Sequence, residues 1–328
     1  MTVAKRVIGL IAAAIGLYVV WPSVIEIFSA WPELSTLNPW WLLGTAACEA
    51  ASFALLWLVL ELALQTDRTW LVASTQLSSN AVGRVVPGGG AAASALQYRL
   101  LVRGGLDGPS VVAGLAATQL ITTAIVAAMP LLSIPAIAGG SAVDRRLVLT
   151  AVVGIVAFAL ILAGTSILFA SDRALSAVAR AAQWLRNAVL RRREALRDLP
   201  DRLVVQRDAM LRTLGHRWGL ALTAAGGRAL LDFLALLCAL SAVGTSARPG
   251  LVLLAYVSAS LLGMIPITPG GLGFVEAGLS STLVLAGVGA GDAVLATLVY
   301  RLASYWLPLV AGAVAYSGYR FSFGARAA

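Results

Sequence analysis

Two proline-glycine segments are the parts of this sequence best suited to binding chemistry. One reads Pro87-Gly88-Gly89-Gly90, and the other reads Pro269-Gly270-Gly271 with Gly273 close behind. Each interrupts a long apolar stretch, where irregular backbone is tolerated only if protein or a water-filled cavity satisfies its polar groups. We therefore expect both segments to line a cavity. Their free amides, just ahead of helices expected to begin near Ala91 and Phe274, would suit an anion such as phosphate.

Charged residues within the apolar stretches form the second group of candidates. A charged side chain at the centre of a bilayer costs at least about 2.5 kcal/mol, so each one invites a functional explanation. Glu276 could bind a cationic headgroup, carry a proton, or accept bonds from the amides of its own turn. Arg301 could form a structural ion pair with Glu276 or bind a lipid phosphate. Arg228 and Asp232 lie four residues apart on one helix face and could neutralise one another.

Three further charged residues flank or face the first proline-glycine segment. Arg84 and Arg99 lie on either side of it, where each could contact a phosphate or extend to the membrane surface. Glu49, in the preceding apolar stretch, is expected to face the first segment. The predicted substrate-binding residues are Pro87, Gly88, Gly89, Gly90, Arg84, Arg99, Pro269, Gly270, Gly271, Gly273, Glu276, Arg301, Glu49 and Asp232.

No pattern for catalysis, metal binding or a cofactor accompanies these candidates. Cys48 and Cys238 are far apart and lack metal-ligand spacing, and His216 is the single histidine. No ATP-binding loop is present, and the glycines after residue 270 do not have the spacing of a dinucleotide-binding loop. We expect neither catalysis nor a cofactor.

The composition is that of a membrane protein. Of 328 residues, 59% are hydrophobic and 12% are charged, against roughly a quarter charged in soluble domains. Residues 147–171 carry no charge at all and exceed the roughly 20 residues that span a bilayer core. The sequence predicts an all-α, polytopic integral membrane protein with one transmembrane domain over residues 1–328.

The apolar stretches form a repeat. Six are long enough for full spans, at residues 7–21, 40–64, 109–138, 147–170, 218–243 and 293–316. Residues 69–102 and 249–289 contain the proline-glycine segments and are predicted to form broken helical hairpins that re-enter the side they came from. Arg68 to Pro87 resembles Arg248 to Pro269, so we assign repeat A to about 40–138 and repeat B to about 218–318.

Charge places the repeats in opposite orientations. The net charge is +9, and residues 172–217 alone contain eleven arginines and five carboxylates, which predicts a cytoplasmic loop rather than a nucleic-acid site. With both termini also cytoplasmic, the hairpins enter from opposite faces, although Arg145 and Arg146 then lie outside. Inverted repeats with broken helices in matching positions are typical of transporters with a site near the midplane.

The basic loop, at about 171–217, has apolar residues at helical spacing, among them Leu175, Val178 and Leu185. We expect one or two interfacial helices on anionic phospholipid. A cytoplasmic or membrane enzyme could also dock there.

The motifs resemble those of the lysylphosphatidylglycerol synthase transmembrane, flippase-like family. The resemblance rests on residues 265–277, which read IPITPGGLGFVEA, on Arg301 and residues 305–308 (YWLP), and on residues 86–90 (VPGGG) and 97–99 (QYR). It implies a stand-alone member without the C-terminal synthase domain, in a bacterial-type plasma membrane. The first motif departs from the family pattern, because residues 91–95 read AAASA and the arginine comes later, so no lysyl-lipid substrate is carried over.

The resemblance and the residues together predict a lipid flippase that moves a phospholipid or lipid-linked headgroup through a cavity lined by the two hairpins. Three alternatives stay open at this point. The chain could be a non-catalytic subunit or scaffold of an envelope-lipid or glycosyltransferase system, an enzyme of envelope-lipid synthesis, or a small-solute permease.

Overall fold

The chain folds into helices throughout the part that the structure describes. This computed structural model describes residues 37–86, 89–133, 145–189, 198–245, 247–263 and 269–323. The longer helices are α3 (Pro39–Leu64), α4 (Thr69–Val85), α5 (Gly89–Arg103), α6 (Gly108–Ala128), α8 (Arg145–Ala170), α9 (Asp172–Val189), α10 (Leu199–Leu214), α11 (Trp218–Ala242), α12 (Pro249–Gly263), α13 (Phe274–Leu285), α14 (Ala290–Arg301) and α15 (Leu307–Phe323). Short turns of helix are η1 (Met129–Ser133), η2 (Gly215–Arg217), η3 (Pro269–Gly271) and η4 (Leu302–Trp306).

Four helices have the length and apolar composition of membrane spans: Pro39–Leu64, Gly108–Ala128, Trp218–Ala242 and the continuous Ala290–Phe323. They overlap four of the six predicted spans. Helix α8, which is 26 residues long, covers the predicted span at 147–170. The first predicted span, at 7–21, lies outside the described residues. The all-α, membrane-spanning class is confirmed.

Local sequence signals set where these helices begin. At the start of α3, the Asn38 side chain accepts a hydrogen bond from the backbone N–H of Trp40, and Pro39 occupies the first turn. Asp107 caps α6 in the same way through the N–H of Ser110. Such caps satisfy N–H groups that have no partner within the helix, and proline suits the first turn because its missing N–H costs nothing there.

Two of the predicted spans end at other residues in the structure than the sequence predicts. The third span was expected to reach residue 138, but α6 ends at Ala128 and continues as the 3₁₀ turn η1, which contains Pro130. Proline removes a backbone donor and crowds the preceding turn of an α-helix. The last span is longer than expected, because α14, η4 and α15 form one continuous helix over Ala290–Phe323.

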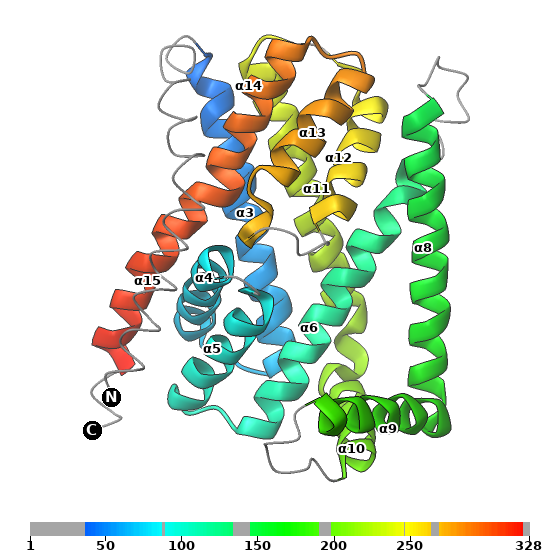
Figure 1. Ribbon diagram of the computed structural model, residues 1–328. Coiled ribbons are helices and arrows are strands. Elements are labelled where there is room, and N and C mark those ends of the chain that lie inside the picture. The colour runs from blue at the N-terminus through cyan, green and yellow to red at the C-terminus, as the bar shows by residue number, and fades with distance from the viewer. Residues whose placement is uncertain are drawn as a thin grey trace.

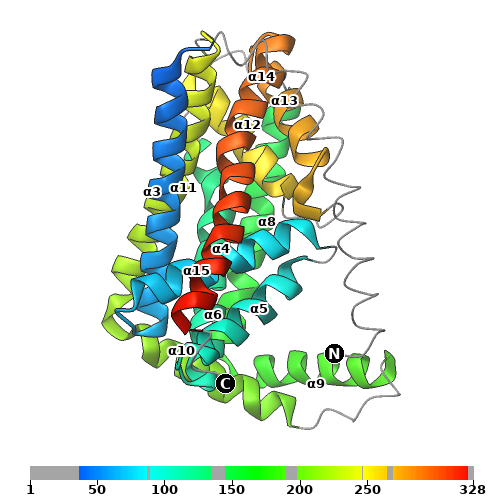
Figure 2. The same cartoon turned by 90° about the vertical axis from the view of Figure 1, so that its left-hand side faces the viewer.

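Two helical hairpins point toward each other from opposite ends of the molecule. Helices α4 and α5 form one hairpin, whose base lies at the end of the molecule where α6 begins, and α12 and α13 form the other, whose base lies at the opposite end (Figure 1). Their tips approach at mid-height, where η3 packs against α4 (Figure 2). The opposed directions agree with the predicted inversion of the repeats.

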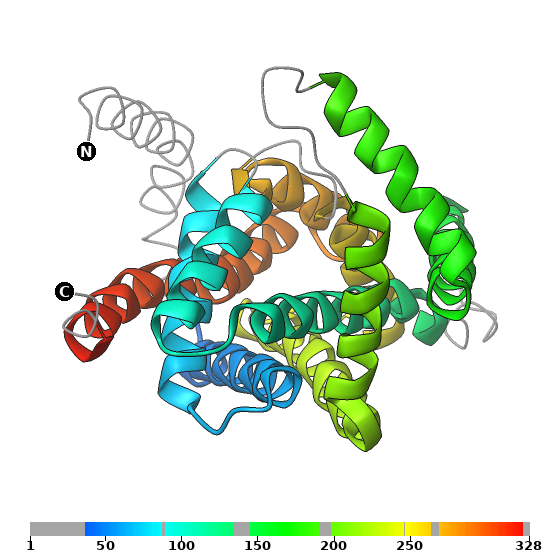
Figure 3. The ribbon, with the colours of Figure 1, turned by 90° about the horizontal axis from the view of Figure 1, so that it is seen from below.

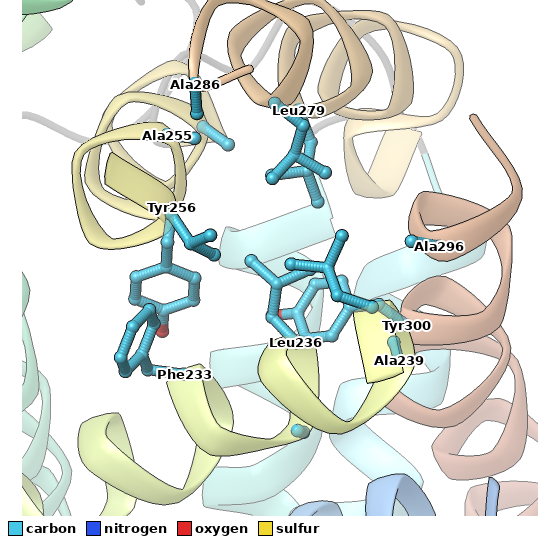
Figure 4. Packing of buried hydrophobic residues seen from close by; sticks show 14 of the residues in the cluster. Phe233, Leu236, Ala239, Ala255, Tyr256, Leu279, Ala286, Ala296 and Tyr300 are labelled. Atoms are coloured by element: carbon cyan, nitrogen blue, oxygen red, sulfur yellow. The ribbon is translucent and has the colours of Figure 1, made fainter. Parts of the chain in front are cut away.

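The largest core lies around α11 and the second hairpin. Leu236 and Ala239 of α11 pack with Leu279 of α13 and Ala296 of α14, and the ring of Phe233 lies beside that of Tyr256 (Figure 4). Small residues let these helices approach closely, which is how helices associate in a lipid environment. This core holds the second hairpin against the long helices.

Helices α9 and α10 lie crosswise to the long helices at the end of the molecule where α8 stops (Figures 1 and 3). An ion pair of 2.6 Å between Arg207 and Asp172 joins them. Trp184 and Val178 on α9 are exposed. This geometry is what an interfacial pair of helices requires, and their binding to anionic lipid stays a prediction.

Candidate functional site

The tips of the two hairpins meet around the ring of Tyr305. The guanidinium carbon of Arg84, from α4, lies 4.7 Å from the ring centroid, and that of Arg301, from α14, lies 4.5 Å from it. Both distances fall within the range of cation–π contacts. The Tyr305 hydroxyl donates to the carbonyl of Arg84 at 3.0 Å, so one buried tyrosine joins both halves of the chain.

Tyr305 reaches this position from a π-helical turn. The turn η4, over Leu302–Trp306, interrupts the long final helix directly after Arg301. Such turns widen a helix by one residue and are frequent at functional sites. Here the turn lies where Arg301 and Tyr305 contact one another.

The second proline-glycine turn closes the site from the other side. Gly270, Gly271 and Gly273 all have positive φ angles, of 61°, 73° and 76°, which L-residues with a side chain rarely adopt. A Cβ on Gly270 would lie 2.6 Å from the Tyr305 ring. The turn therefore needs glycine at position 270 both for its backbone angle and for its close approach to the ring.

Glu276 carries the negative charge of the site. It lies in the first turn of α13, where the helix dipole favours an acid. Its Oε1 accepts a hydrogen bond of 2.6 Å from Nε of Arg301, whose Nη2 also donates to the Gly270 carbonyl at 3.3 Å. The Glu276 Oε2 atom is buried and has no hydrogen-bond partner among the described residues.

Arg84 carries a buried donor, the counterpart of the Glu276 acceptor. Its Nε donates to the side-chain oxygen of Asn80, one helical turn earlier. Its Nη1 is buried and forms no hydrogen bond within the part of the chain that the structure describes. Within the described residues, a cationic nitrogen and a carboxylate oxygen without partners thus lie in one cluster, and buried polar groups without partners are uncommon in folded proteins. We call Arg84, Arg301, Tyr305, Glu276 and Gly270 the hairpin junction.

A second polar cluster surrounds Asp232 on α11. Tyr256 donates its hydroxyl proton to Asp232 Oδ2 at 2.5 Å, and Tyr300 donates to Oδ1 at 2.8 Å. Glu49 of α3 interacts electrostatically with both Asp232 and Arg84, so this cluster adjoins the hairpin junction. The Oε1 atom of Glu49 is buried and has no partner in the described ranges of the chain.

The geometry alone does not identify the protein family of this chain, but a match to a family model does. The model described as lysylphosphatidylglycerol synthase TM region matches residues 7–312. The chain belongs to the lysylphosphatidylglycerol synthase transmembrane family. No curated protein matches the chain at a significant level.

Within this family member, the structure brings most of the predicted charged residues together. Glu276, Arg301 and Arg84 form the hairpin junction, and Glu49 joins Asp232 beside it. The suggested pairing of Arg228 with Asp232 is not formed, because Asp232 accepts its bonds from two tyrosines and Arg228 makes no salt bridge with a described carboxylate.

The first proline-glycine segment and Arg99 are placed differently. Pro87 and Gly88 lie outside the described residues, and α5 begins at Gly89. Gly90 has nothing within 4 Å of a Cβ built on it, and Pro269 opens η3. Arg99 is exposed on α5, away from the hairpin junction.

Tyr305 is the member of the hairpin junction that was not predicted as a site residue. It belongs to the YWLP segment at 305–308, and a tyrosine one helical turn after an intramembrane arginine was the available signal. Asn80 was missed for a similar reason, since its one-turn spacing to Arg84 was the only indication.

Proposed function

We propose that this member of the family is a lipid translocator, in which the headgroup crosses at the hairpin junction while the acyl chains stay in the bilayer. The proposal assigns movement of a lipid, and no chemical reaction, to the chain. It rests on one observation: the opposed hairpins meet at Tyr305, and there Arg84 Nη1 and Glu276 Oε2 are buried without a partner among the residues that the structure describes.

The junction offers an anionic headgroup two guanidinium groups. Arg84 and Arg301 lie against the same ring, and Glu276 neutralises only Arg301 directly. A phosphate at Arg84 would satisfy the unpaired Nη1 and offset the repulsion between the two cations, because guanidinium binds phosphate in a bidentate manner. Glu276 would then hold positive charge from a headgroup or carry a proton.

The opposed directions of the two hairpins support a transport path that opens alternately to the two faces of the membrane. Their bases lie at opposite ends of the molecule (Figure 1), and broken helices at a repeat interface are the usual setting of a transporter site. In this proposal both hairpins are re-entrant, and the chain lies in a bacterial-type plasma membrane with both termini cytoplasmic. Helices α9 and α10 rest on anionic phospholipid at the cytoplasmic face.

The test is translocation of lipids by the purified protein in liposomes. Phospholipids labelled on one acyl chain are incorporated, and the label in the outer leaflet is quenched chemically over time. We expect vesicles with the protein to lose more than half of the label rapidly, and protein-free vesicles to retain the inner-leaflet half. If vesicles with the protein give the same traces as protein-free vesicles for anionic, zwitterionic and lysyl lipids, unaided translocation is refuted and the subunit or permease alternatives are favoured.

A further inference from the structure

A buried acid of α3 lines a pocket that the hairpin junction does not include. Glu49 has only 5% of its surface exposed, and its Oε1 atom has no hydrogen-bond partner among the described residues. It also forms no salt bridge with any cation in the described part of the chain. A buried carboxylate without such partners is costly as an anion, and a bound proton removes that cost.

A second acid, Asp232 of α11, lies at the same level as this acid of α3. A Cβ on Gly44 would lie 3.4 Å from Cys238 Sγ, and a Cβ on Gly227 would lie 2.9 Å from Leu55 Cδ1. Helices α3 and α11 therefore pack antiparallel, and each acid is midway along its own helix between these two contacts. The two carboxyl groups interact electrostatically. Two carboxylates that share one site repel one another strongly when both are ionised.

The hydrogen bonds of Asp232 indicate which acid holds the proton. Tyr256 donates to its Oδ2 atom and Tyr300 donates to its Oδ1 atom. Both oxygens of Asp232 therefore act as acceptors, as they do in an ionised carboxylate, and each keeps a second lone pair. Glu49 receives no such bond at Oε1 from the described residues. One proton shared by the pair thus belongs on Glu49.

Other ionisable groups surround Glu49 without binding it directly. They are Arg84 of α4, Arg228 of α11, Tyr256 of α12 and Tyr300 of α14. Neither arginine forms a salt bridge with a described carboxylate. The two tyrosines are engaged with Asp232. Helix α6, which also packs on α3, contains no ionisable residue.

The pocket beside Glu49 is apolar and opens to the side of the helix bundle. Its volume is about 210 Å³, and residues of α3, α4, η4 and α15 line it. Glu49 is the one ionisable side chain among the described residues that line it. Ala50, Leu307 and Ala311, which belong to the lining, are exposed. An apolar molecule in the bilayer can therefore reach the carboxyl group from the side.

We infer that Glu49 and Asp232 form a proton-binding site, and that its proton crosses the membrane together with the lipid. The pair holds one exchangeable proton, as an O–H bond on Glu49. Release breaks this bond, passes the proton to water at the opposite face and leaves two carboxylates. The inference rests on the proposed function and deepens it, because it names the ion that drives the movement.

Arg84 links the proton to the lipid. Its guanidinium interacts electrostatically with Glu49 and belongs to the hairpin junction. When Glu49 is protonated, Arg84 has one competing anion fewer and holds a phosphate more strongly. When the phosphate leaves, Arg84 stabilises the Glu49 carboxylate and favours release of the proton. Proton and phosphate therefore increase one another's affinity, and such coupling is reciprocal.

The site suits a proton better than a metal cation. Hard cations such as Ca²⁺ and Mg²⁺ take about six or more oxygen ligands. Both oxygens of Asp232 already accept bonds from tyrosines. Among the described residues that line the pocket, Glu49 alone has side-chain oxygens.

The first experiment labels the site with dicyclohexylcarbodiimide, an apolar reagent that reacts with protonated carboxyl groups. The purified protein is treated near neutral pH and at alkaline pH, and peptide mass spectrometry locates the modified acids. We expect Glu49 to be modified near neutral pH and to lose the modification at alkaline pH. The exposed Asp67 should stay unmodified under both conditions. Absence of the label from Glu49 near neutral pH would overturn the inference.

The second experiment applies a pH gradient to the liposome assay. Vesicles with a trace of labelled phosphatidylglycerol are made about one pH unit more acidic outside, with the membrane potential held at zero. One proton for each lipid charge predicts enrichment of the label in the inner leaflet by up to about tenfold, because one pH unit is worth about 1.4 kcal/mol. Protein-free vesicles should keep an equal distribution.

Three variants show whether Glu49 carries the proton. Glu49→Gln keeps the size of the side chain but cannot release a proton, so the label should stay equally distributed. Glu49→Asp keeps a carboxyl group and should retain part of the enrichment. Asp67→Asn, at an exposed position, should match the wild type. Lipid exchange without a gradient is measured for each variant, so that lost coupling is distinguished from lost movement.

The outcomes separate this inference from the proposed function. A wild-type protein that moves lipid but ignores the pH gradient would overturn the inference and leave the translocator proposal intact. Enrichment in Glu49→Gln equal to that of the wild type would also overturn it, as would a response to a sodium gradient in place of the pH gradient. Labelling of Glu49 without any lipid movement would support the proton site and contradict the translocator proposal, together with the coupling that depends on it.

Discussion

The hydroxyl of Tyr305 donates to the backbone carbonyl of Arg84 at 3.0 Å, across 221 positions of the sequence. The bond ties the end of the first hairpin's leading helix to the final long helix, which also carries Arg301. A change at Tyr305 therefore tests both the stability of the fold and the alignment of the two hairpin tips.

Two substitutions of Tyr305 distinguish the stability contributed by its hydrogen bond from that contributed by its ring. Tyr305→Phe removes the hydrogen bond and should lower the free energy of unfolding by about 1 kcal/mol. Tyr305→Leu also removes the surface that Arg84 and Arg301 contact, and should cost about 3 kcal/mol. Thermal unfolding in detergent measures both, with the exposed Tyr316→Leu as a control. Equal losses for Phe and Leu would show that the ring contacts contribute nothing.

Gly270→Ala tests the close approach of the second turn to the same ring. The φ of 61° and the contact at 2.6 Å predict a loss of about 2 kcal/mol or more in stability. Gly90→Ala is the matched control, because it lies in the first turn of α5 with open space around it and should be neutral or slightly stabilising. Similar melting temperatures for the two variants would contradict the packing described here.

Asp232→Ala should destabilise the protein more than either tyrosine variant beside it. It leaves the hydroxyls of Tyr256 and Tyr300 without their acceptor, and each buried orphan donor costs about 1–3 kcal/mol. Tyr256→Phe or Tyr300→Phe removes one donor and should cost about 1 kcal/mol. Additive losses in the Tyr256→Phe, Tyr300→Phe double variant, with no further loss from Asp232→Ala, would show that the cluster does not act as a unit.

Cysteine labelling tests the inverted arrangement. In a background with Cys48→Ala and Cys238→Ala, Asp67→Cys lies at the base of the first hairpin and Gly291→Cys near the base of the second, and both positions are exposed. A membrane-impermeant maleimide added to whole cells should label Gly291→Cys and leave Asp67→Cys unlabelled until the cells are opened. Labelling of both positions from one side would contradict opposed hairpins.

Much of the fold could be predicted from apolar length and charge. The spans around α3, α6 and α11 were evident because each is a long apolar stretch with few charged residues, and charges are costly in a bilayer. The same cost singled out Glu276 and Arg301, whose pairing across 25 positions the structure confirms. Arg84 was expected beside the first proline-glycine segment, and the structure places it at the hairpin junction.

The geometry between distant segments could not be predicted in this way. Whether Asp232 pairs with Arg228 or accepts from two tyrosines depends on how α12 and α14 pack against α11, which no spacing within one helix encodes. The π turn that carries Tyr305 is likewise set by packing.

The translocation rate of site variants tests the central claim most directly. Glu276→Gln and Arg84→Gln are compared with Asp67→Asn and Arg320→Gln, which likewise neutralise one acid and one arginine, at exposed positions. All four are reconstituted at equal density, and the initial rate of labelled phosphatidylglycerol movement is measured. We predict at least a tenfold loss for the two junction variants, with the controls at the wild-type rate. Junction variants that fold normally and move lipid as fast as the wild type would contradict a path through the hairpin junction.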